Sequence, residues 1–176
     1  MVVFSADQKS KEATLVRQMS GKLRDDIIAF EKYRHQHTQR TFYQFCSIRN
    51  KHNEIQGLIF TIQDRMPMVQ DLLPENMANW VMRAKLMALT IFAEISREFV
   101  SNPPLTLTGS LTARDVLSLE QANFAEAQKF FNSVLMEQAL DDKTAGELDH
   151  TLELIEETIG MIQALLSKSK NYLQDF

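Results

Sequence analysis

Breaks in the chain are scarce, and this scarcity constrains the fold more than any other sequence feature. Only 5 glycines and 4 prolines occur in 176 residues. An all-β fold needs a turn about every dozen residues, and this chain has too few turn-forming residues to supply them. Apolar residues at helical spacing fill the long stretches between the breaks. We therefore expect an all-α protein: an antiparallel helical bundle of four to five helices with heptad-like seams, forming a single domain over residues 1–176.

Three stretches of the chain carry a regular apolar seam. The clearest alternates steps of three and four residues, as the buried edge of a packed helix does. Its members are Phe45, Ile48, His52, Ile55, Ile59, Ile62 and Met66. A similar seam runs through 148–173. The stretch 75–100 is apolar on most of its sides, so we expect it to be either the central helix of the fold or one face of an oligomer.

Two sequence features indicate where helices begin and end. Ser5 with Gln8, and Thr41 with Gln44, have the spacing of a capping box, which satisfies free N–H groups at a helix start. Residues 34–41 contain no aliphatic or aromatic side chain. An unbroken helix over residues 5–66 would be about 90 Å long, so we expect a kink or break at 34–41. Residues 101–111, with two prolines, form the longest expected loop.

Charge is unevenly distributed along the chain. Residues 1–66 carry 11 basic and 7 acidic side chains, whereas residues 111–176 carry 5 and 12, within a formal net charge of −4. The negative net charge argues against non-specific binding along nucleic acid.

The chain has one cysteine, Cys46, which excludes an internal disulfide and fits a reducing compartment. With no signal peptide or spanning segment visible, we expect a cytoplasmic protein, or one secreted without a cleaved signal.

The common catalytic motifs do not occur in the sequence. It has no glycine-rich phosphate loop, no C-x-x-C or H-E-x-x-H metal motif and no G-x-S-x-G elbow. Glu147 and His150 form a single E-x-x-H pair, but a dimetal bundle site uses two such pairs. His150 also lies two residues from the seam position Leu148 and so points away from the bundle. We therefore expect no catalysis, no cofactor and no bound metal.

These features favour a non-catalytic protein-interaction module: an adaptor, a regulator or a small subunit of a larger assembly. We expect it to associate with itself or with a protein partner, because the stretch 75–100 is more apolar than one buried face requires. The residues we expect at an apolar contact are Trp80, Met87 and Phe92. Those we expect at a charged contact, on the last helix, are Glu153, Glu156 and Glu157.

A second hypothesis is a helical protein associated with nucleic acid. Basic and aromatic residues alternate near the end of the first helix, a combination that suits single-stranded nucleic acid. The candidate contacts are Arg34, His35, His37, Arg40 and Lys51. Phosphate contacts of this kind would make the affinity depend on salt.

A third hypothesis concerns His52. Its seam position predicts burial, and a buried imidazole needs a hydrogen-bond partner. The functional alternative is a histidine switch, or the phospho-accepting histidine of a helical-bundle phosphotransfer module, which requires an exposed ring.

Overall fold

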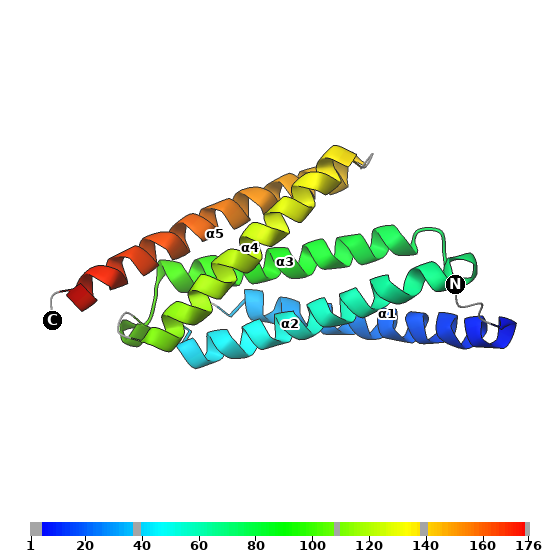
Figure 1. Ribbon diagram of the computed structural model, residues 1–176, viewed down its shortest axis with the longest axis horizontal. Coiled ribbons are helices and arrows are strands. Elements are labelled where there is room, and N and C mark those ends of the chain that lie inside the picture. The colour runs from blue at the N-terminus through cyan, green and yellow to red at the C-terminus, as the bar shows by residue number, and fades with distance from the viewer. Residues whose placement is uncertain (1–4, 37–39, 108–109, 138–140, 175–176) are drawn as a thin grey trace.

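Five long α-helices make up most of the chain (Figure 1). The computed structural model describes residues 5–36, 40–107, 110–137 and 141–174. The helices are α1 (Ala6–Arg34), α2 (Phe42–Arg65), α3 (Met77–Ser101), α4 (Leu111–Glu137) and α5 (Asp142–Gln174). Short 3₁₀ helices lie in the connections: η1 (Met66–Met68), η2 (Gln70–Leu72) and η3 (Leu105–Leu107). The described part of the chain has no strand, which confirms the expected all-α fold.

The helices are arranged around α3. Helices α1, α2 and α3 all pack against one another, and α5 packs on α3 and on α4. Successive helices run in opposite directions, so the bundle is antiparallel as expected (Figure 1). Helix α3 is thus the central helix, shared by the α1–α2 pair and the α4–α5 pair. None of the helices in the described ranges combines the length and apolarity needed to cross a membrane.

The chain breaks where the sequence indicates. Helix α1 ends at Arg34 and α2 begins at Phe42, so the break at 34–41 is confirmed. Thr41 caps α2: its hydroxyl accepts a hydrogen bond from Gln44 N at 3.2 Å, and Gln44 Oε1 accepts one from Thr41 N at 2.8 Å. Ser5 and Gln8 form the same capping box at the start of α1. Residue His37 lies outside the described residues.

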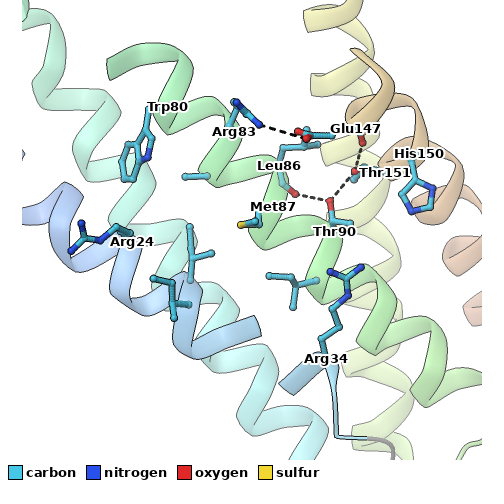
Figure 2. Close-up of a pocket in the computed structure, with 14 residues that line it drawn as sticks. Arg24, Arg34, Trp80, Arg83, Leu86, Met87, Thr90, Glu147, His150 and Thr151 are labelled. Atoms are coloured by element: carbon cyan, nitrogen blue, oxygen red, sulfur yellow. Dashed lines mark hydrogen bonds and ion pairs between the residues drawn. The ribbon is translucent and has the colours of Figure 1, made fainter. Parts of the chain in front are cut away.

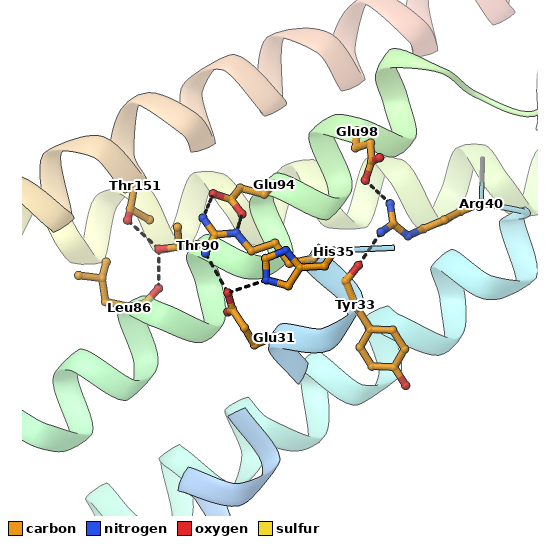
Figure 3. A network of polar contacts seen from close by, with 10 residues as sticks. Glu31, Tyr33, His35, Arg40, Leu86, Thr90, Glu94, Glu98 and Thr151 are labelled. Atoms are coloured by element: carbon orange, nitrogen blue, oxygen red, sulfur yellow. Dashed lines mark hydrogen bonds and ion pairs between the residues drawn. The ribbon is translucent and has the colours of Figure 1, made fainter. Parts of the chain in front are cut away.

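A buried arginine stabilises this break. Arg40 is 6% exposed, and its Nη2 donates to the carbonyl oxygens of Tyr33 at 2.7 Å and Gln36 at 3.0 Å. The Tyr33 carbonyl lies in the last turn of α1 and the Gln36 carbonyl lies just beyond the helix, where the regular pattern of helical hydrogen bonds has ended. The guanidinium also forms an ion pair with Glu98 of α3 (Figure 3). Arg40 therefore joins the end of α1 to the central helix.

The core is built from the seams together with a set of stacked rings. All the expected seam residues of α2 from Phe45 to Ile62 are buried. Phe45 stacks on Phe99 with ring centroids 4.3 Å apart, and Phe92 stacks on His52 at 4.3 Å and on Phe124 at 5.6 Å. These rings connect α2, α3 and α4. On the other side, Thr90 of α3 and Thr151 of α5 share a hydrogen bond of 2.8 Å.

Phe92 and Met87, both on α3, offer a direct comparison of core with surface. Phe92 is 1% exposed and Met87 is 52% exposed. We expect Phe92→Ala to lower the free energy of unfolding by about 3–5 kcal/mol, because it removes a buried ring and leaves a cavity. Met87→Ala should cost less than about 1 kcal/mol. Urea denaturation followed by circular dichroism measures both, and equal losses would contradict the central position of Phe92.

Candidate functional site

A groove opens between α1, α3 and α5 (Figure 2). Its volume is about 420 Å³. Helix α1 contributes four residues between Arg24 and Arg34, α3 contributes seven between Trp80 and Ile91, and α5 contributes Glu147, His150 and Thr151. Helices α1 and α5 both pack on α3, and the groove lies between them.

The floor of the groove is apolar and partly open to solvent. Met87 of α3 is 52% exposed and Ile28 of α1 is 58% exposed, and Trp80 lies half-buried along the same side of α3. Ile27, Ala84 and other buried residues lie beneath them. Large apolar side chains that stay exposed next to one another, with polar residues around them, mark surfaces that contact other molecules.

The rim of the groove is mainly basic. Arg24, Arg34 and Arg83 surround the apolar floor, and His150 lies on the α5 side (Figure 2). Arg83 Nη2 lies 3.5 Å from Glu147 Oε1 across the groove, with both side chains nearly half exposed. The Arg24 side chain is largely exposed, and its Nη2 lies 3.2 Å from Oδ1 of Asp25, the next residue in the chain. Exposed pairs of this kind are weak, so these arginines remain available to other carboxylates.

The structure brings together two of the three residues expected at an apolar contact. Trp80 and Met87 both line the groove. Phe92 does not: it lies in the core between His52 and Phe124, so its expected place at an interface is wrong. On α3, the Phe92 side chain faces α2 and α4, and these two helices cover it. Ile28 of α1 also lines the groove and was not predicted from the sequence, although it directly follows the buried Ile27.

The acidic residues expected at a charged contact lie apart from the groove. Glu153, Glu156 and Glu157 are exposed on α5, and none of them lines the groove. Glu157 Oε2 accepts a hydrogen bond from Arg97 Nη1 of α3 at 2.9 Å. Whether these carboxylates meet a partner stays a prediction.

The basic residues proposed for nucleic acid do not form one free surface. Arg34 donates to Glu31 at 3.0 Å and to Glu94 at 2.6 Å, and Arg40 is buried against Glu98 (Figure 3). Lys51 Nζ lies 3.3 Å from Asp26 and 3.0 Å from Glu54. His35 is exposed, with Nε2 3.9 Å from Glu31. Carboxylates thus surround these cations, and the expected role of Arg40 as a surface contact is wrong.

His52 is a core residue. It is 8% exposed and its ring lies between those of Phe92 and Phe30, with centroid distances of 4.3 and 6.1 Å. Its Nε2 lies 3.1 Å from Gln56 Nε2. Burial, with the nearby positive charge of Arg49, lowers the pKa of His52 to about 3, so the ring is neutral at pH 7. The predicted burial is confirmed, and an exposed phospho-accepting ring is contradicted.

Neither a metal centre nor a related protein accounts for the groove. Within the described ranges no three His, Cys, Asp or Glu side chains cluster to hold a metal ion. Glu147 of the E-x-x-H pair contacts Arg83 instead. Burial raises the pKa of the Cys46 thiol, which disfavours the reactive thiolate.

Comparison with protein-family models, with curated proteins and with solved structures finds no match to this chain.

The buried neutral His52 makes stability depend on pH. Its pKa is about 3 in the folded chain and 6.5 when free, so between these values the unfolded chain binds more protons. Above about pH 6.5 this difference in pKa has little effect on the free energy of unfolding. As the pH falls toward 3, the unfolded chain takes up a proton at His52 and the free energy of unfolding decreases. Between pH 7 and pH 5 the free energy of unfolding should drop by about 2 kcal/mol through this group alone. Urea denaturation at each pH measures the slope.

Two variants isolate the contribution of His52. In His52→Leu the drop between pH 7 and pH 5 should shrink by that amount, since the other titrating groups are unchanged. In Met136→Leu, which changes an exposed side chain that does not titrate, the slope of the wild type should persist. The same slope in His52→Leu as in the wild type would show that His52 takes up protons in the folded chain.

Proposed function

We propose that the protein is a non-catalytic protein-interaction module, and that its α1–α3–α5 groove receives an acidic amphipathic helix from a partner protein. The observation that carries this proposal is the exposure of Met87 and Ile28 inside a rim of arginines. A single exposed apolar side chain is common on a globular protein, but here Met87 and Ile28 line one groove together with the half-buried Trp80.

The shape of the groove favours a helix as the occupant. The groove lies between three long helices, and its floor follows the turns of α3 at positions 80, 84, 87 and 91. An amphipathic helix presents its own apolar side chains at the same spacing, so the two surfaces can interdigitate. Trp80 and Met87 would be the anchors of the contact, because large apolar side chains near the centre of an interface contribute most of the affinity.

The charge of the rim favours acidic residues beside the apolar face of the partner. Arg24 and Arg83 are exposed, on opposite sides of the floor, and their ion pairs, with Asp25 and Glu147, are exposed and weak. Arginine recognises carboxylates through a planar, two-pronged geometry that lysine lacks. Such rim charges would set the orientation of the helix and the rate of its association more than its affinity.

Two other functions have less support. Nucleic-acid binding would need the basic residues near the α1–α2 break, and carboxylates of α1, α2 and α3 occupy them. Self-association, expected from the sequence, stays a prediction. A second copy of the chain is a possible occupant of the same groove, and sedimentation distinguishes it from a partner helix.

The test uses two synthetic amphipathic helices with the same leucine face, one flanked by glutamates and the other by lysines. Fluorescence anisotropy should show the acidic helix binding about tenfold more tightly to the wild type. Met87→Glu should abolish this binding by placing a charge in the floor. The double variant Arg24→Glu, Arg83→Glu should reverse the preference between the two helices.

Met136→Glu is the matched control, because Met136 is exposed on α4 and does not line the groove. It should bind like the wild type. Equal binding of the two helices, or an equal loss in the Met136 and Met87 variants, would contradict the proposal. A dimer in sedimentation that Met87→Glu dissociates would assign the groove to self-association instead.

A further inference from the structure

A second cavity lies between α2, α3 and α4. Its volume is about 390 Å³, within the range of small-molecule sites. The cavity and the α1–α3–α5 groove share no lining residue. Asn53, Asn123 and Glu126 line the cavity and are exposed, so it is open to solvent. A small molecule can therefore reach it from solution.

Lys85 of α3 places an amine at the wall of this cavity. It lines the cavity and is half-buried, and its Nζ lies 3.8 Å from the ring centroid of Phe130 and 6.0 Å from that of Phe131. Both rings belong to α4 and line the same cavity. Nζ makes no hydrogen bond in the described chain, and it is absent from the unpaired atoms that lie wholly beneath the surface, so it keeps accessible surface. A ligand in the cavity can thus reach the amine.

The amine of Lys85 lacks a carboxylate partner. Burial lowers the pKa of Lys85, and no carboxylate in the described ranges counters this effect. Lys51 of α2 is the contrasting case: its Nζ lies 3.0 Å from Glu54 and 3.3 Å from Asp26, and these carboxylates raise its pKa. Only the neutral form of an amine is a nucleophile, and a lowered pKa makes that form more abundant near neutral pH. Lys85 is therefore the more reactive kind of lysine.

The other ionisable groups of the cavity do not pair with this amine. Glu120 is buried and forms an ion pair with Arg49 of α2, so its charge is already compensated. His52 is neutral at pH 7, because burial holds its pKa at about 3. Glu126 is exposed, where water screens its charge. Burial thus governs the protonation of Lys85.

Apolar surface remains open beside the amine. Phe130 is 37% exposed, and Ala127, one helical turn earlier, is half-buried. Both line the cavity. By contrast, Phe92 and Phe124 are each 1% exposed and are covered by their neighbours. An alkyl chain laid against Phe130 and Ala127 would remove apolar surface from water, which is favourable.

We infer that the α2–α3–α4 cavity binds a small apolar aldehyde, which Lys85 Nζ holds as a reversible imine. The neutral amine attacks the carbonyl carbon, and the adduct then loses water: a C=N bond replaces the C=O bond, and both amine protons leave with the oxygen. Water reverses the reaction, and no oxidant or reductant is consumed. The alkyl chain of the aldehyde lies against Phe130 and Ala127. This binding is independent of the function proposed for the α1–α3–α5 groove.

Trapping with sodium cyanoborohydride tests the inference, because this reagent reduces an imine to a stable secondary amine. The wild type is incubated with hexanal near neutral pH, and peptide mass spectrometry locates the alkylated lysines. Lys85 should react at least about tenfold faster than Lys129, an exposed lysine of α4 that does not line the cavity. Both rates come from one sample of the folded wild type, so no variant has to fold. Equal rates, or slower reaction at Lys85, would overturn the inference.

Two comparisons distinguish a binding cavity from an amine that is merely reactive. Formaldehyde has no alkyl chain, so its preference for Lys85 over Lys129 should be at least about threefold smaller than that of hexanal. Ala127→Phe fills the cavity and should lower the hexanal rate at Lys85 to that of Lys129. Leu119→Phe, at an exposed position of α4 outside the cavity, is the matched control and should react like the wild type. An equal preference with both aldehydes, or an equal effect of the two variants, would show that the cavity does not hold the aldehyde.

Discussion

The burial of α3 on nearly all sides is the constraint on which the rest of the structure depends. A helix with apolar residues around most of its circumference must be covered by other helices, or water would contact that surface. Helices α1 and α2 cover one part and the α4–α5 pair covers another. Straight helices around a central one do not close completely, so grooves remain where the two pairs meet. The α1–α3–α5 groove and the cavity between α2, α3 and α4 are two such places.

The packing around α3 also determines which charges stay available. Arginines of the basic first third pair with acidic residues that lie far away in sequence: Arg34 with Glu94, Arg40 with Glu98 and Arg49 with Glu120. These pairs connect the first third of the chain to α3 and α4. The positive charges of these three arginines are therefore neutralised by acidic residues of later helices. Arg24 and Arg83 stay exposed beside the apolar floor of the α1–α3–α5 groove, and these two arginines motivate the proposed function.

The two grooves differ in their chemistry although they flank the same helix. The α1–α3–α5 groove has flexible, exposed apolar side chains and hydrated arginines, which suit the variable side chains of a protein partner. The α2–α3–α4 cavity has stacked rings, a buried imidazole without a partner at one nitrogen, and a partly desolvated ammonium.

The sequence by itself determined the helices, their breaks and the buried faces, because periodicity and capping are local properties of the chain. The buried seam of α2 with His52 in it, and the capping box at Thr41, follow from spacing alone. Only the tertiary structure decided that Phe92 faces α4 while Met87 stays open, and that Arg40 is buried against Glu98. A helical pattern shows that a face is covered but not which helix covers it, and an ion pair between residues 58 positions apart leaves no local signal. The grooves, and thus the candidate sites, arise from that choice of neighbours.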